Sequence, residues 1–168
     1  MKIKEKLDSG PILTSTEIDL DQNTTHGEME KKLSLMGADL LIESLKTVEA
    51  GTSKFIDQKH LEATYAKKID KNEAKINWNL DARRVLAHIH GLSPSPGAWF
   101  EHGRDRVKVL KSKPIKGSGA PGFVLEGMAI ACGEGVLQVE TVQPSGKKPM
   151  DAADFLNGYD LPPGTILT

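Results

Sequence analysis

The stretch from Ala98 to the end of the sequence restricts the fold most narrowly. Its apolar residues fall into short runs separated by glycines, the pattern of short strands joined by tight turns. Val107 and Val109 alternate with Lys108 and, further on, Lys111, so one face of this strand should be buried and the other cationic. Strands are predicted at Trp99–His102, Val107–Ile115, Gly122–Glu126, Met128–Cys132 and Val136–Val142. Five such strands favour a small antiparallel β-barrel of the OB type.

Helical signals surround this β region. Thr25 and Glu28 have the spacing of a capping box, and apolar residues then recur at helical spacing, which predicts a helix from His26 to Ala50. A second helix is predicted from Asn79 to His90, with Asn79 or Asp81 as the cap and Val85, Leu86 and Ile89 buried. A short helix capped by Asp151 should close the chain. The overall prediction is an α+β protein.

The residues before the long helix offer little to bury its apolar face. Leu7 to Leu20 suits a turn followed by a half-buried strand, with few large apolar side chains. We therefore expect that part of a domain is missing at the N-terminus.

Composition excludes several classes of protein. The 38% hydrophobic residues suffice for a core, so a wholly disordered chain is not expected. No run approaches the roughly 18 apolar residues of a membrane span, and no apolar signal segment follows Met1. A single cysteine, Cys132, rules out an internal disulfide and a multi-cysteine zinc site. These observations favour a cytoplasmic protein that does not associate with membranes.

Charge is unevenly distributed along the chain. Residues 58–150 hold 15 Lys and Arg against 9 Asp and Glu, whereas residues 1–57 hold 7 against 11. A basic block between acidic flanks suggests a polyanionic partner, nucleic acid first. The alternative is a solvated surface rich in lysine. If the basic side chains face one groove, they would neutralise several phosphates. The candidate RNA-binding residues are Lys67, Lys68, Lys71, Lys75, Arg83, Arg84, Arg104, Arg106, Lys108, Lys111, Lys147 and Lys148.

Aromatic residues are scarce in the basic block. Trp78 and Trp99 are expected in the core rather than as stacking platforms. This scarcity favours recognition of the backbone and shape of a folded RNA over the reading of single strands.

Catalytic motifs are largely absent. The sequence has no phosphate-binding glycine loop, nucleophile elbow or zinc-protease motif. His88 and His90 would lie about 200° apart around a helix and cannot bind one metal together, so no metal site is predicted. Cys132 has no neighbouring base and should be a buried, unreactive thiol.

Several segments resemble methionyl-tRNA formyltransferases. They are ATYAKKI at residues 63–69, KNEAKINW at 71–78, GAWF at 97–100 and QPSGKKPM at 143–150. The segment LDSG at residues 7–10 looks like the family's catalytic LDTG segment. The resemblance runs in order through nearly the whole chain, and it corresponds to the C-terminal half of these enzymes.

The resemblance implies a reaction and a domain organisation. These enzymes transfer a formyl group from 10-formyltetrahydrofolate to the methionyl amine of initiator tRNA. By analogy, residues 1–57 would be the remnant of a Rossmann-like catalytic domain, residues 58–78 the linker, and residues 79–168 an OB-like tRNA-binding domain. The family is expected to be monomeric, whereas the exposed helix face would favour association of this chain.

Only part of the family's catalytic site has a counterpart here. Asp8 matches the catalytic aspartate, but the family's catalytic Asn and His and most of its folate pocket have no match. The chain is therefore expected to bind tRNA, to bind no folate and to be inactive alone. Two alternatives remain open: a stand-alone RNA-binding module, or the matching half of a sugar-amine formyltransferase.

Overall fold

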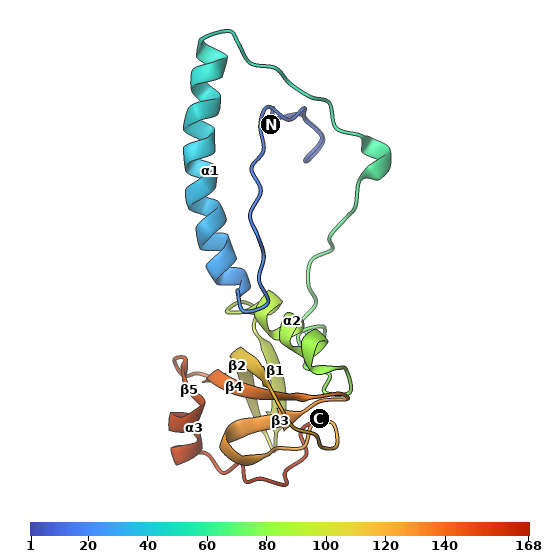
Figure 1. The fold of residues 1–168 in the computed structure, drawn as a ribbon, viewed down its shortest axis with the longest axis vertical. Coiled ribbons are helices and arrows are strands. Elements are labelled where there is room, and N and C mark those ends of the chain that lie inside the picture. The colour runs from blue at the N-terminus through green and yellow to red at the C-terminus, as the bar shows by residue number, and fades with distance from the viewer. The chain divides into compact units, whose positions relative to one another are not determined.

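The computed structural model describes residues 1–168, and the chain divides into two compact units. The first unit contains Met1–Leu20 and Met29–Lys68, and the second contains Asp21–Glu28 and Ile69–Thr168. Helix α1 (His26–Glu49) therefore begins in the second unit and continues in the first (Figure 1). None of the helices has the length and hydropathy needed to cross a bilayer.

Helix α1 confirms the predicted capping box. The Thr25 amide donates to Glu28 Oε2 at 2.8 Å, and the Glu28 amide donates back to Thr25 Oγ1 at 3.3 Å. These reciprocal bonds satisfy two backbone donors that a helix start leaves free. The apolar face of α1 is not buried, however: no residue of the helix is buried, and Leu41 keeps 60% of its surface exposed.

The remainder of the first unit contains little regular structure. The short 3₁₀ helix η1 (His60–Glu62) is its only other helical element. The strand expected within Leu7–Leu20 does not form, because the only β-bridge there joins Ile12 to Ile56. A strand needs a neighbouring strand along its length to satisfy its backbone groups, and this unit supplies none.

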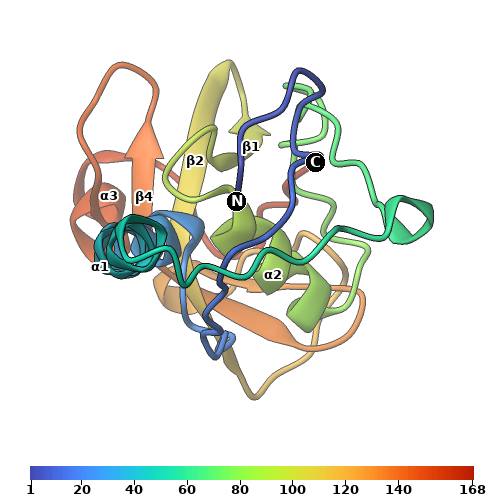
Figure 2. The same cartoon turned by 90° about the horizontal axis from the view of Figure 1, so that it is seen from above.

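The second unit is built on an antiparallel sheet. Its strands are β1 (Ala98–His102), β2 (Asp105–Ile115), β3 (Ala129–Ala131), β4 (Val136–Pro144) and β5 (Met150–Asp151). They run in the order β1-β2-β4-β3, and β5 pairs with β4. Figure 2 shows β4, β2 and β1 in sequence across the sheet, with α3 (Ala152–Gly158) beside β4. Four of the five predicted strands and the short final helix are confirmed.

One predicted strand is wrong and one observed strand was not predicted. Gly122–Glu126 forms only single bridges, from Phe123 to Ile166 and from Val124 to Ile130. The 3₁₀ helix η2 (Glu126–Met128) follows directly, with Gly127 at φ 63°, and it leads into strand β3. Strand β5 was missed because its two residues carry no periodic pattern.

The sheet is antiparallel but not closed into a barrel. Beyond its edges the pairing continues through isolated bridges: Lys75 with Trp99 of β1, Val124 with Ile130 of β3, and Asp81 with Glu134 in the turn between β3 and β4. The amide of Ile76 donates to the Trp99 carbonyl at 2.8 Å, and that of Gly133 donates to the Trp78 carbonyl at 2.9 Å. Residues 74–82 thus run from β1 to the turn between β3 and β4.

Helix α2 (Ala82–Leu92) covers the sheet and completes the core. Asp81 caps it, accepting a hydrogen bond from the Arg84 amide at 3.0 Å. The predicted face is buried, with Ile89 fully enclosed, and the helix packs on β2. The predicted helix is thus confirmed, although it ends two residues later, at Leu92. Trp78 and Trp99 are also buried, as expected for core tryptophans.

Candidate nucleic-acid interface

Strand β2 carries a row of cations on its outer face. Val107 and Val109 are fully buried, so Arg106 and Lys108 point outward by strand alternation. The register with β4 shifts on either side of Lys111. This bulge keeps Leu110 and Ser112 buried and returns Lys111 to the outer face. We call Arg106, Lys108, Lys111 and Lys113 the cationic row.

Trp99 anchors one end of the cationic row. It lies opposite Lys108 in the register of β1 and β2. The Arg106 guanidinium lies 3.7 Å from the centroid of the Trp99 ring, and Lys75 Nζ lies 5.8 Å from it. The indole Nε1 donates to the carbonyl of Lys71 at 3.3 Å. The structure thus brings the Lys75 side chain and the Lys71 backbone, both from before α2, together with Arg106 and Lys108 of β2.

Acidic partners hold most of the cationic row in place. Ion pairs join Arg106 to Glu101 at 3.2 Å, Lys111 to Glu28 at 3.4 Å and Lys113 to Glu140 at 2.9 Å; Lys108 forms no ion pair. These pairs are partly exposed, so they contribute little to stability and can exchange with a phosphate. Hydrogen bonds from Thr25, with a smaller contribution from Lys111, lower the pKa of Glu28.

Two other predicted cations approach this face from the loop after β4. Gln143 is the register partner of Lys108 on β4, and its Nε2 donates to the Lys147 carbonyl at 2.9 Å. Lys147 and Lys148 are exposed in this loop. Arg104 is exposed in the turn between β1 and β2.

Arg83 and Arg84 do not join the Trp99 end of the row. They lie in the first turn of α2, where Asp81 forms a bridge with Glu134 next to strand β4. Arg84 forms an ion pair with Asp81 at 3.7 Å. Both arginines therefore lie at the other edge of the sheet from Trp99.

Lys67, Lys68 and Asp8 belong to the first unit. Both lysines are exposed in a segment without regular structure. Asp8 is exposed in a turn at φ 53°, and its carbonyl accepts a hydrogen bond from Gln58 Nε2 at 2.9 Å. Its carboxylate forms neither a hydrogen bond nor an ion pair. The structure therefore places no acid–base partner beside Asp8.

Other chemically active side chains do not form a site. No group of three His, Cys, Asp or Glu side chains is arranged to bind a metal ion. Cys132 is buried, and desolvation raises the pKa of its thiol to about 11. The prediction of an unreactive cysteine agrees with this burial.

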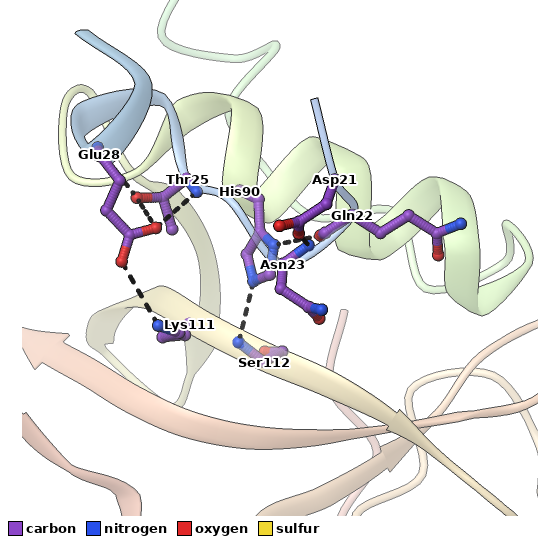
Figure 3. A network of polar contacts seen from close by, with 8 residues as sticks. All are labelled: Asp21, Gln22, Asn23, Thr25, Glu28, His90, Lys111 and Ser112. Carbon is purple, nitrogen blue, oxygen red and sulfur yellow. Dashed lines mark hydrogen bonds and ion pairs between the residues drawn. The ribbon is translucent and has the colours of Figure 1, made fainter. Parts of the chain in front are cut away.

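Sequence reasoning missed a polar network at the start of α1. His90 contacts Gln22 and Ser112, and Glu28 contacts Lys111 (Figure 3). The one available signal was a histidine on the buried side of α2, next to Ile89 and four residues after Leu86.

Comparisons with known proteins identify relatives of the whole chain. Residues 68–160 match the family described as "Formyl transferase, C-terminal domain". A methionyl-tRNA formyltransferase of Jannaschia sp. is 41% identical over 99% of this chain and 55% of its own length. One from Chelativorans sp. is 43% identical over 100% and 56%. The chain spans about half the length of the curated relatives that it matches.

Solved structures share the fold at low sequence identity. HypX from Aquifex aeolicus in complex with tetrahydrofolic acid aligns with a TM-score of 0.73 and 18% identity, over 98% of this chain and 32% of that protein. An N-formyltransferase from Helicobacter canadensis, in complex with folinic acid and dTDP-3-aminofucose, aligns with a TM-score of 0.62 and 16% identity, over 82% and 52%.

Proposed function

Because the chain belongs to the formyl transferase C-terminal domain family, we propose that it is the tRNA-binding part of a methionyl-tRNA formyltransferase. Such an enzyme would transfer a formyl group from 10-formyltetrahydrofolate to the methionyl amine of initiator tRNA in translation initiation. The partner of this chain would be the initiator methionyl-tRNA, in the cytoplasm. The identity of about 42% to curated enzymes of that name supports this proposal.

The cationic row is the observation that carries the RNA-binding role. Four cations lie along the outer face of one strand, and the Trp99 end adds Lys75, with the Lys71 backbone beside it. Arg106 is oriented by both Trp99 and Glu101. A guanidinium fixed in this way loses little side-chain entropy when it binds a phosphate. The exchangeable ion pairs leave the row able to follow a phosphodiester backbone.

The remaining predicted RNA contacts complete this proposal. Lys147, Lys148 and Arg104 would extend the surface, and Lys67 and Lys68 would contact the RNA from the linker. Arg83 and Arg84 would bind a separate stretch of backbone, since they lie at the other sheet edge. In this organisation, residues 1–57 are the remnant of the catalytic domain, 58–78 the linker, and 79–168 the RNA-binding domain. An OB-like platform is supported by the isolated bridges at both edges of the sheet.

Formyl transfer requires more than this chain contains. Asp8 would be the catalytic aspartate, but its exposed carboxylate forms no hydrogen bond or ion pair with another side chain. One carboxylate cannot orient a donor, an amine and a developing oxyanion. We expect the formyl donor to bind elsewhere in the whole enzyme. The chain by itself should show no formyltransferase activity.

Titration with initiator methionyl-tRNA at several salt concentrations tests the RNA-binding role. The double variant Arg106→Ala, Lys108→Ala removes two phosphate contacts, so the slope of log affinity against log salt should fall by about 1 to 2. The double variant Lys31→Ala, Lys32→Ala makes the same charge change on α1 and should leave the slope unchanged.

Equal effects of the two double variants would contradict a specific role for the cationic row. A complete lack of tRNA binding at low salt would reject the proposal and favour the sugar-amine formyltransferase alternative.

A further inference from the structure

His90 connects two segments through two backbone groups. Its Nδ1 lies 2.9 Å from the carbonyl oxygen of Gln22, and its Nε2 lies 3.3 Å from the amide nitrogen of Ser112 (Figure 3). A carbonyl only accepts and an amide N–H only donates. Both contacts are satisfied together only by a neutral imidazole with its proton on Nδ1. His90 is buried, so water does not compete for either nitrogen.

The segment that His90 contacts is fixed by two further interactions. The Gly27 amide donates to the Ser93 carbonyl at 2.9 Å. A Cβ atom at Gly27 would lie 2.6 Å from Pro94 Cδ, so the backbone here approaches the end of α2 more closely than any other residue allows. Thr25 is buried within the same segment. The first turn of α1 is therefore part of the second unit.

This placement brings an acid onto the cationic row. Glu28 Oε1 lies 3.4 Å from Lys111 Nζ. Lys111 is adjacent to Ser112, and the Ser112 amide donates a hydrogen bond to His90 Nε2. The charged side chains of this polar network are Asp21 and Glu28, from residues 21–28, and Lys111 from β2 (Figure 3). The His90 imidazole thus contacts both the segment that carries Glu28, through Gln22, and the strand that carries Lys111, through Ser112.

We infer that His90 is a positioning residue: held with its proton on Nδ1, it fixes residues 21–28 against β2 and so places the Glu28 carboxylate on Lys111. Glu28 then restrains one cation of the row until a phosphate displaces it. The effect on RNA rests on the proposed function, whereas the tautomer and the restraint on Lys111 do not.

The tautomer is measured directly by long-range proton–nitrogen NMR of the imidazole ring in the full chain at pH 8. The expected spectrum is that of the form protonated on Nδ1. A spectrum of the form protonated on Nε2, which is the preferred tautomer of free histidine, would overturn the inference.

Two conservative variants separate positioning from simple packing. His90→Gln can still place an acceptor near the Ser112 amide, and His90→Asn can still place a donor near the Gln22 carbonyl. Hydrogen exchange should therefore show a protected Ser112 amide in the Gln variant and a protected Gly27 amide in the Asn variant. His90→Leu should lose both protections. Equal behaviour of all three variants would contradict the inference.

The restraint on Lys111 has its own readout. Glu28→Gln should raise the rate at which an acylating reagent modifies Lys111 by roughly two- to fivefold, the range for loss of an exposed ion pair. Glu30→Gln makes the same charge change two residues along α1 and should not alter that rate. An unchanged rate in Glu28→Gln would overturn the restraint.

RNA binding completes the test. If the proposed function holds, Glu28→Gln should bind initiator tRNA more tightly than Glu30→Gln at low salt, because one more cation is free. Equal or weaker binding would overturn this part of the inference. If neither the variants nor the unmodified chain bound tRNA, the proposed function would be rejected. The role of His90 would then be decided by the NMR and acylation results alone.

Discussion

Helices α1 and α2 begin with the same type of cap but lie in different environments. Thr25 caps α1 and Asp81 caps α2, each accepting a hydrogen bond from the amide three residues on. Helix α1 has 24 residues and buries none of them, whereas α2 has 11 and buries six. A cap and an apolar face are therefore enough to predict a helix, but they do not show whether a surface is present to receive it.

This contrast indicates that the stability of the chain comes mainly from the second unit. Most helical stability in proteins comes from packing of the apolar face rather than from propensity. Helix α2 obtains that packing from the sheet, and the core of the second unit holds both tryptophans. We expect the second unit to unfold cooperatively and the greater part of α1 to contribute little to that transition.

A charge placed in each region should give the largest difference. Val109→Asp places an unpaired charge in a fully buried position and should destabilise the second unit by roughly 3 kcal/mol or more. Leu41→Asp places the same charge on the exposed face of α1 and should change the free energy of unfolding by less than about 0.5 kcal/mol. Urea unfolding followed by tryptophan fluorescence measures both. A Val109→Asp protein as stable as the parent would show that the face of β2 is assigned the wrong way round.

The next largest difference should be in the reactivity of a thiol placed in each of the two regions. With its pKa raised to about 11, Cys132 is almost entirely protonated at pH 8. Ser34→Cys would add an exposed thiol on α1, which should react with iodoacetamide roughly a hundredfold faster or more. Mass spectrometry of the two sites in one protein measures the ratio. Comparable rates would show that the second unit opens readily.

The same raised pKa predicts a loss of stability at high pH. The unfolded chain releases the thiol proton near the ordinary pKa of 9.0, whereas the folded chain retains it up to about 11. Folding therefore keeps the full benefit of the buried thiol below pH 9, and this benefit declines as pH rises from 9 to 11. Cys132→Ala should lack this part of the pH dependence.

Two glycines of α1 should give small effects of opposite sign. Gly27→Ala would force Cβ against Pro94 and should destabilise the packing of residues 21–28 on the end of α2 by about 1 kcal/mol or more. A Cβ at Gly37 meets no atom within 4 Å, so Gly37→Ala should raise helix content and stability by up to about 1 kcal/mol. Circular dichroism during thermal unfolding measures both. Stabilisation by both substitutions would contradict the placement of the first turn in the second unit.

Local chemistry in the sequence was sufficient for much of the fold. The Thr25–Glu28 spacing located the start of α1, and Asp81 that of α2. Alternation in β2 assigned Val107 and Val109 to the core and Lys108 to the surface. These features depend on hydrogen bonds and periodicities between residues that are close in the chain, so they can be read before any tertiary contact is known.

Long-range contacts decided the rest. The bulge at Lys111 depends on the register with β4, the Trp99–Arg106 contact on the pairing of β1 with β2, and the His90 network on where residues 21–28 meet α2. Each of these contacts joins residues that are far apart in the sequence, and no local pattern relates them. By itself the sequence determined the α-helices, four of the five strands of the sheet and which side chains are basic; only the tertiary structure decided which of those basic side chains share a surface.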